Sequence, residues 1–223
     1  MYLLATIVIL SYLIGSIPTS ILITRWVKGV DIRNYGSGNA GGTNVFRVVG
    51  WKYGILTIIL DALKGAIAVI FIARLHYGNM PFENITPFDD FTLIQIIAGV
   101  SAVVGHIWTI FAGFRGGKGI ATALGFMLTL CTIDMLLALV VFMIVVLITK
   151  YISLGSILAA VSVPVILVVR ENVFGVDIPG YNLILPFTIG VVGLLIFTHR
   201  KNVARLIKGT ENKIHFSKKK NSK

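Results

Sequence analysis

The sequence predicts an all-α, polytopic membrane protein with seven transmembrane helices, the N-terminus outside and the C-terminus in the cytoplasm. Of its 223 residues, 56% are hydrophobic and only 13% are charged, and the mean hydropathy is +0.90, which excludes an ordinary soluble domain. Apolar runs of roughly membrane-spanning length recur along the chain, and most of them carry no charged residue. The basic residues gather in alternate connecting segments, as expected when those segments face the cytoplasm.

Seven apolar runs are the candidate spans: residues 1–24, 53–73, 91–114, 119–133, 135–149, 154–169 and 182–198. In the first run, Gly15 and Pro18 predict a kink of the kind that membrane helices tolerate. No Lys or Arg precedes Arg25. The first run therefore lacks the basic start of a cleavable signal peptide, and we expect it to be retained.

The runs 119–133 and 135–149 are short and separated only by Asp134, so they could form two spans or one bent span. The distribution of charge favours two. With seven spans, the inner segments hold all of the 20 Lys and Arg residues except Arg74, Arg170 and Lys64. With six spans, the basic C-terminal end would lie opposite the other basic segments, against the positive-inside tendency.

No internal repeat divides the chain, so we expect one seven-helix domain over residues 1–213 and a basic, disordered cytoplasmic tail over residues 214–223. The net charge of +11 lies mostly in the inner segments and the tail. This placement suits membrane lipid headgroups and argues against nucleic acid as a partner. We expect a monomer without a cofactor. We also expect no metal site, because no cluster of His, Cys or carboxylates has ligand spacing.

A glycine loop with one lysine, residues 115–119 (RGGKG), joins two of the apolar runs. Its glycines let the backbone approach a ligand closely, and Gly119 leads into a helix whose N-terminus attracts anions. Gly116, Gly117, Lys118 and Gly119 are therefore candidates for binding phosphate. The loop is not a P-loop, because that motif needs Ser or Thr directly after the lysine. A plain turn with a lysine at the membrane edge is the alternative.

Residues 31–47 (DIRNYGSGNAGGTNVFR) mix glycines with small polar residues. Hydroxyl and amide groups bind phosphate oxygens without bulk, and an arginine adds a planar fork that suits them. The candidates are Ser37, Asn39, Thr43, Asn44 and Arg47. A flexible, solvated loop is the alternative reading of this composition.

A third basic segment, residues 199–213 (HRKNVARLIKGTENK), follows the last apolar run. Within it, His199, Asn202 and Arg205 have i, i+3, i+6 spacing, so on a helix they would share one side. We interpret them as site residues. The alternative is a juxtamembrane basic helix that holds lipid headgroups.

Three ionisable residues lie within predicted spans. Asp61 and Lys64 are three residues apart, which lets them pair on one helix face, and ionisable groups in a bilayer are usually paired or functional. We expect a structural intramembrane pair, with a direct substrate role as the alternative. His106 lies toward the inner end of the third run, and a hydrogen-bonded packing histidine is favoured there over a base.

Four groups of residues resemble the signature motifs of the bacterial acyl-phosphate:glycerol-3-phosphate acyltransferases, the PlsY family. They are Ser37-Gly38-Asn39, Gly41, Thr43-Asn44 and Arg47; Asp61 and Lys64-Gly65; Gly105-His106, Phe111, Phe114, Gly116-Gly117-Lys118-Gly119, Ala121-Thr122 and Gly125; and His199-Arg200, Asn202, Arg205-Leu206, Gly209, Glu211 and Lys213. The resemblance runs through nearly the whole chain. Ala40 and Thr109 depart from it, because the family is expected to have proline at both positions.

The resemblance implies a multi-pass enzyme of the bacterial cytoplasmic (inner) membrane with its active site facing the cytoplasm. It implies transfer of a fatty acyl group from acyl phosphate to the 1-hydroxyl of sn-glycerol 3-phosphate, giving lysophosphatidic acid and phosphate. Neither a G-x-S-x-G elbow nor a His with Asp four residues later is present, so positioning and electrostatic stabilisation are expected to supply the rate.

On this reading, the roles divide among the three basic segments. Ser37, Lys118, His199 and Asn202 are expected to be catalytic, and Asn39, Thr43, Asn44, Arg47, Gly116, Gly117, Gly119 and Arg205 to bind substrate phosphates, with Asp61, Lys64 and His106 in support. The base is either His199 or a phosphate oxygen of a substrate. A membrane transporter for an organic phosphate anion is the alternative function, although the polar groups gather at the inner face and not at the midplane.

Overall fold

The computed structural model describes residues 2–75, 89–211 and 213. Every regular element in these ranges is helical, which confirms the predicted all-α class. The described residues form two compact units, one up to Thr132 and the other from Ile133. Each unit is described by itself below, and the prediction that residues 1–213 form a single domain stays a prediction.

Unit 1 contains most of the polar candidates. Its elements are α1 (Tyr2–Gly15), α2 (Thr19–Lys28), η1 (Ile32–Asn34), α3 (Gly42–Val48), α4 (Trp51–Ile67) with the π and 3-10 turns η2 (Ala68–Ile72) and η3 (Ala73–Leu75), α5 (Asp90–Ile107), η4 (Ile110–Ala112) and α6 (Ile120–Leu130). The helix of the first apolar run is interrupted between Gly15 and Thr19. This interruption confirms the kink that Gly15 and Pro18 predict.

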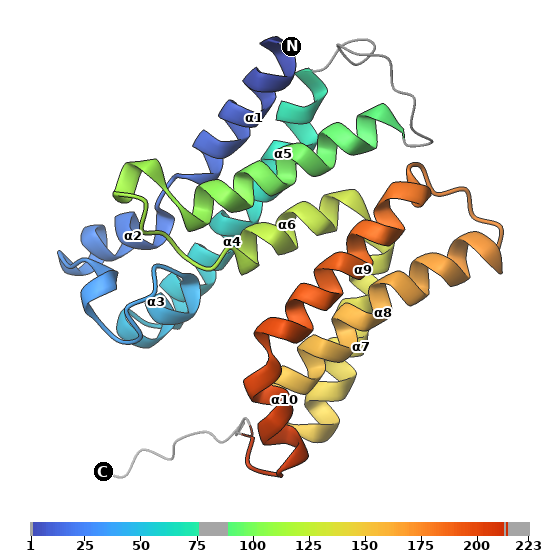
Figure 1. Cartoon of the computed structure of the whole chain (residues 1–223). Coiled ribbons are helices and arrows are strands. Elements are labelled where there is room, and N and C mark those ends of the chain that lie inside the picture. Colours follow the sequence, from blue (N-terminus) through green and yellow to red (C-terminus); the bar gives the residue numbers. More distant parts are fainter. Residues whose placement is uncertain (1, 76–88, 212, 214–223) are drawn as a thin grey trace. The chain divides into compact units, whose positions relative to one another are not determined.

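Close backbone approaches join the long helices of unit 1. α1 packs against α5 and α4 packs against α6, and Figure 1 shows these helices side by side. A Cβ atom added at Gly15 or Gly105 would overlap the backbone across the α1 and α5 contact, and one at Gly65 or Gly125 would overlap the backbone across the α4 and α6 contact. Small residues thus form the helix contacts, as expected within a membrane where apolar burial gives little driving force.

The short helices α2 and α3 lie at the end of unit 1 away from the N-terminus, as Figure 1 shows. The segment that joins α5 to α6 comes to the same end. The two glycine-rich segments of the sequence analysis are therefore neighbours in unit 1.

Unit 2 consists of α7 (Thr132–Thr149), α8 (Ile152–Asn172), α9 (Tyr181–Thr198) and α10 (Arg200–Ile207). α8 packs along α9, and α10 contacts both. Near the start of α7, the buried Asp134 carboxylate accepts a hydrogen bond of 2.6 Å from Arg170 at the end of α8. This ion pair joins the start of α7 to the end of α8, as in an antiparallel hairpin.

Five helical segments of the described chain are long and apolar enough to cross a membrane: Tyr2–Lys28, Trp51–Leu75, Asp90–Ala112, Thr132–Thr149 and Ile152–Asn172. Two shorter apolar helices, Ile120–Leu130 and Tyr181–Phe197, coincide with the remaining predicted runs. A break at Cys131 separates α6 from α7, so these runs are two helices. The seven-span topology and the side on which each terminus lies stay predictions, and the tail at 214–223 is outside the described residues.

Candidate functional site

Asn44 organises the first glycine-rich segment of unit 1. Its side chain is 1% exposed. Its Nδ2 group donates to the backbone oxygens of Ile32 at 3.3 Å, Tyr35 at 2.9 Å and Asn39 at 3.1 Å, while Oδ1 accepts from the Ser37 amide at 2.9 Å. A single buried side-chain amide thus supplies the hydrogen bonds that backbone groups of this loop would otherwise form within a strand or helix.

These bonds give Asn44 a structural role in place of the expected phosphate contact, and that contact stays an untested prediction. Both polar atoms of its side chain are committed to the loop backbone, and burial keeps them from a ligand. Asn44 therefore shapes the loop that carries the other candidates. Sequence composition gave no signal of this difference, because an asparagine suits either role.

The other candidates of the first segment are more accessible than Asn44. Ser37, Thr43 and Arg47 are exposed and Asn39 is half-buried. Thr43 and Arg47 are four residues apart on α3, so they share a helix face. Among the described residues, the Arg47 guanidinium makes no ion pair or hydrogen bond to a protein group, which leaves its full charge for an anionic ligand.

Arg33, which was not among the predicted site residues, fastens the first segment to the segment before the glycine loop. Its Nε and NH2 groups donate to the Asp31 carboxylate at 3.0 and 2.7 Å, and NH1 donates to the Ala112 carbonyl at 2.8 Å. The hydrogen bonds from Arg33 lower the pKa of Asp31 to about 2. The bidentate pair with Asp31 fixes the direction of the guanidinium, and its NH1 bond to Ala112 then joins the two segments.

The glycine loop turns back on the end of α5. The Gly116 amide donates to the Ile107 carbonyl at 3.0 Å, and the Gly117 amide donates to the His106 carbonyl at 3.1 Å. These two amides are therefore already used within the protein, although they were expected to face an anion. Gly116 and Gly117 contribute the tight path of the loop instead.

Gly117 is the point where the two glycine-rich segments meet. A Cβ atom at this position would overlap the His106 imidazole on one side and the Ala40 carbonyl oxygen on the other. Only a residue without a side chain fits this contact. The absence of a side chain thus allows the loop of Lys118 to lie directly against the loop of Ser37 and Asn39.

Lys118 follows this contact with an exposed side chain. Within the described parts of the chain, its ammonium group has no ion pair or hydrogen-bond partner. Gly119 has φ of 78°, a left-handed conformation that turns the chain into α6. The first amides of α6 point toward this turn, and the helix dipole adds partial positive charge there.

Asp61 and Lys64 form the intramembrane pair that their spacing predicts. Lys64 Nζ lies 2.6 Å from Asp61 Oδ1, and the two side chains are 5% and 1% exposed. Lys64 also donates to the Ile17 carbonyl at 2.5 Å, and the Thr19 hydroxyl donates to the same Asp61 oxygen. Removing one partner of such a buried pair typically costs about 3–5 kcal/mol, since the other charge is then uncompensated.

His106 belongs to the same cluster. Its Nδ1 lies 3.5 Å from Asp61 Oδ1, and its side chain is 8% exposed. The sequence offered no nearby partner for this histidine, because the partner lies on a different helix. The favoured packing role agrees with this burial.

In unit 2, the third basic segment closes on Glu211. Asn202 Nδ2 donates to Glu211 Oε1 at 2.9 Å, Arg205 Nε donates to Oε2 at 2.7 Å, and the Ser153 hydroxyl donates to Oε1 at 3.0 Å. The Arg205 and Asn202 hydrogen bonds lower the pKa of Glu211 below the usual range of a glutamate. Two of the three residues predicted to share one side of a helix thus converge on one carboxylate.

His199 lies between α9 and α10. Its Nδ1 is 2.9 Å from the Leu195 carbonyl. A carbonyl oxygen can only accept, so Nδ1 must carry a proton, and in the neutral ring Nε2 then holds the lone pair.

The two departures from the family pattern are both buried. Thr109 has φ of −67°, close to the value that proline imposes, and its hydroxyl donates to the Ser16 carbonyl. Threonine thus keeps a backbone shape that suits proline and adds a hydrogen bond to the residue that directly follows α1. Ala40 is 4% exposed, and its carbonyl oxygen faces Gly117.

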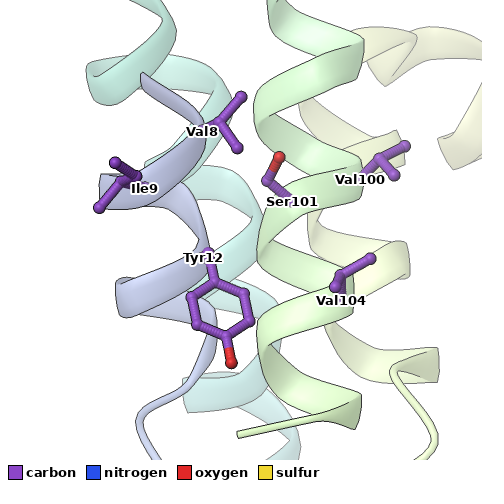
Figure 2. Close-up of a pocket in the computed structure, with 6 residues that line it drawn as sticks. All are labelled: Val8, Ile9, Tyr12, Val100, Ser101 and Val104. Carbon is purple, nitrogen blue, oxygen red and sulfur yellow. The ribbon is translucent and has the colours of Figure 1, made fainter. Parts of the chain in front are cut away.

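A separate groove of about 210 Å³ lies between α1 and α5. Figure 2 shows Val8, Ile9 and Tyr12 on one side of it and Val100, Ser101 and Val104 on the other. None of the predicted site residues lines it. Its mostly apolar wall suits hydrocarbon and not phosphate.

Comparison with known proteins gives one consistent answer. A family model described as "Glycerol-3-phosphate acyltransferase" matches residues 5–209. The glycerol-3-phosphate acyltransferase of Chlorobium phaeobacteroides (strain BS1) is 44% identical, and the alignment covers 97% of this chain and 98% of that protein. The protein of the same name from Chlorobaculum parvum (strain DSM 263 / NCIMB 8327) is 42% identical, with 96% and 97% covered.

Solved structures agree with the sequence relatives. The chain resembles the crystal structure of PlsY (YgiH), described as an integral membrane glycerol 3-phosphate acyltransferase, in its glycerol 3-phosphate form. The TM-score is 0.70 at 35% identity, with 95% of this chain and 96% of that chain covered. The lysophosphatidic acid form of PlsY gives the same TM-score at 34% identity. The chain is therefore a membrane protein of the PlsY family of glycerol-3-phosphate acyltransferases.

Proposed function

We propose that the protein transfers a fatty acyl group from acyl phosphate to the 1-hydroxyl of sn-glycerol 3-phosphate, giving lysophosphatidic acid and inorganic phosphate. The observation that carries this proposal is the contact at Gly117. It sets the loop of Lys118 against the loop of Ser37 and Asn39, and it brings together two segments that suit phosphate.

Both substrates carry phosphate, and the unit 1 loops offer matching charge. Arg47 and Lys118 are exposed cations without a protein partner among the described residues. Arginine can bind a phosphate through two parallel hydrogen bonds, while lysine acts as a point charge. The hydroxyl groups of Ser37 and Thr43 add hydrogen-bond donors for phosphate, and these small side chains leave room for the substrate.

The reaction needs no covalent enzyme intermediate. The 1-hydroxyl oxygen attacks the acyl carbonyl carbon, and the bond from that carbon to the phosphate oxygen breaks. The phosphate leaves with the bonding electron pair. The hydroxyl proton goes to a base, which is either His199 or a phosphate oxygen of a substrate. Cations that stabilise the departing phosphate would supply much of the rate.

The geometry of unit 2 refines the roles of the third segment. With its proton on Nδ1, a neutral His199 presents a lone pair at Nε2, so it can accept a hydrogen bond from the 1-hydroxyl. It cannot donate from Nε2 to a developing oxyanion in that form. The Nε group of Arg205 is bound to Glu211, and its two terminal NH2 groups remain suited to the phosphate of glycerol 3-phosphate.

The placement of charge supports a site at the cytoplasmic face of the bacterial inner membrane. All three basic segments follow or precede apolar helices on the side where the sequence gathers its Lys and Arg residues. A water-soluble acceptor and a membrane-held acyl chain can meet at such an edge. We propose that a monomer carries the complete site.

The test is an assay of the purified protein with palmitoyl phosphate, with and without glycerol 3-phosphate. We expect equimolar lysophosphatidic acid and phosphate only when both substrates are present. Palmitoyl-CoA should give no comparable rate, since the described chain shows no feature dedicated to a nucleotide. Absence of lysophosphatidic acid, or equal rates with palmitoyl-CoA, would overturn the proposal. Flux of glycerol 3-phosphate into proteoliposomes without product would indicate a transporter.

A matched pair of lysine variants tests the site within the same assay. Lys118→Ala should lower kcat/KM by at least roughly 100-fold, about 2.7 kcal/mol, because one charge-assisted contact to the transition state is lost. Lys52→Ala is the control, since Lys52 is exposed on the first turn of α4 and lies over the Trp51 ring. It should change kcat/KM by less than about threefold. Equal losses would remove Lys118 from the site.

A further inference from the structure

We propose that His106 is a positioning residue, fixed by the buried Asp61 on one side, which holds Gly117 and so sets where Lys118 lies. The imidazole therefore acts on the reaction through the loop and does not touch substrate. This inference rests on the proposed function, because its effect is measured on acyl transfer.

The anchor of the imidazole is a cluster built by three helices. Asp61 on α4 receives Lys64 at 2.6 Å and the hydroxyl of Thr19 from α2, and His106 Nδ1 from α5 lies 3.5 Å from the same oxygen. A carboxylate beside Nδ1 favours the tautomer with the proton on that nitrogen, since a carboxylate can only accept. The side chains of Asp61, Lys64 and His106 are all at least nine-tenths buried.

The opposite edge of the ring meets the glycine loop. A Cβ atom at Gly117 would overlap His106 Nε2, so the ring lies against the backbone of Gly117. The His106 carbonyl accepts the Gly117 amide at 3.1 Å, and the Ile107 carbonyl accepts the Gly116 amide at 3.0 Å. The side chain and the backbone of one residue therefore hold the same point of the loop.

The position of Gly117 affects the site because Gly117 lies between Lys118 and the first glycine-rich segment. Lys118 is the next residue along the chain, and the Ala40 carbonyl of the first segment faces Gly117 from the other direction. A displaced imidazole would shift Gly117 and change the distance of Lys118 from Ser37 and Asn39. Catalysis by positioned charges is sensitive to shifts of about 1 Å.

The same geometry argues against His106 as the general base. Its side chain is 8% exposed, Nδ1 faces Asp61 and Nε2 faces Gly117, so neither nitrogen is open to a substrate hydroxyl. Charged groups within a membrane are costly to keep. A cluster that fixes the loop gives these groups a function that does not require contact with substrate.

A double-mutant cycle between His106 and Lys118 tests the proposal. His106→Leu should lower kcat/KM at least about tenfold in the wild-type background, but by less than about threefold in Lys118→Ala, because misplacing a lysine that is absent costs little. His106→Asn should recover part of the loss, since its amide can donate to Asp61 as Nδ1 does. Asp61→Asn should behave like His106→Leu in the cycle.

Ile94→Ala is the control for a loss of stability alone. Ile94 is fully buried on α5, the helix of His106, but lies about three turns away from it. This substitution should lower Tm, and its effect on kcat/KM should be additive with Lys118→Ala. If His106→Leu does not fold, His106→Asn completes the cycle, since it keeps a polar group that can donate to Asp61 and leaves the Asp61 and Lys64 pair intact.

The outcomes separate the two proposals. If the wild type forms lysophosphatidic acid, the proposed function stands. If the effects of the His106 and Lys118 variants on kcat/KM then multiply independently, the positioning role is overturned. An inactive wild type would overturn the proposed function. In that case the same cycle is measured on the Kd for inorganic phosphate by calorimetry, where coupling supports the positioning role and additivity overturns it.

Discussion

Asn202 donates a hydrogen bond of 2.9 Å to Glu211, so the segment after α10 folds back onto the helix that it follows. Arg205 and Ser153 reach the same carboxylate. Ser153 comes from the first turn of α8, which means that one acidic side chain fixes the third basic segment to the helices of unit 2. Glu211, which was not among the predicted site residues, thus orients Asn202 and Arg205, which were.

Glu211→Gln should release this segment. The neutral amide cannot accept from Asn202, Arg205 and Ser153 with the strength of a carboxylate, so we expect kcat/KM to fall at least about tenfold and Tm to fall with it. Glu171→Gln is the control, because Glu171 accepts one bond from the Ile178 amide at the other end of α8. A loss that is the same in both variants would contradict the role of Glu211 in the site.

Asn44→Asp tests whether Asn44 shapes the first loop or binds a ligand. The substitution places an oxygen where Nδ2 donates to three carbonyl groups, and it does so in a side chain that is 1% exposed. We expect a large fall in Tm, because acceptors would face acceptors in a buried site. Asn34→Asp, an exposed change in the same segment, should leave Tm within about one degree. A normal Tm with only a raised KM would restore Asn44 as a ligand contact.

Gly117→Ala should disable the site with little change in overall folding. The added methyl group would overlap the His106 ring and the Ala40 carbonyl, so the loops must move apart. We expect kcat/KM to fall by roughly 100-fold, which corresponds to about 2.7 kcal/mol. Gly190→Ala serves as the control, since a Cβ there meets nothing within 4 Å. Full activity of Gly117→Ala would show that the two loops need not touch.

The Asp31 and Arg33 pair predicts a specific pH dependence. The pKa of Asp31 is lowered to about 2 in the folded protein from an ordinary value of 3.8. A lowered pKa contributes stability above the ordinary value, and that stability is lost as pH falls toward the folded pKa. Asp31→Asn should therefore lower Tm by a similar amount at every pH from about 8 to about 5, and the difference from wild type should shrink below about pH 4.

The measurement is Tm in detergent across that pH range. Asp177→Asn is the control, because Asp177 is exposed in the loop between α8 and α9, and it should match the wild type throughout. A Tm difference for Asp31→Asn that appears only at low pH would be the opposite pH dependence and would refute the pairing.

The sequence predicted the parts of this structure that depend on local spacing. Apolar runs located the helices, Gly15 and Pro18 located the interruption after α1, and a separation of three located the Asp61 and Lys64 pair. Each of these follows from the period of one helix or from the chemistry of one residue.

What the sequence could not predict depends on contacts between distant segments. His106 has no partner among its sequence neighbours, and only the packing of α4 against α5 brings it to Asp61. Composition marked Asn44 as polar and small but could not tell whether its amide faces a ligand or the loop's own carbonyls. Arg33 was passed over for the same reason, because its link to Ala112 joins segments far apart in the chain.

The helix contacts of unit 1 interleave along the chain, since α1 packs with α5 and α4 with α6. The ribosome makes the helices in chain order. The contact of α1 with α5 and that of α4 with α6 therefore cannot form until the later helix of each pair has been made. Asp61 and Lys64 therefore enter with Thr19 already made but with the imidazole of His106 still to come. A chain that stops after α4 would leave the glycine contact surfaces of α1 and α4 without their partner helices, and it would leave the Asp61 and Lys64 pair in the bilayer without His106.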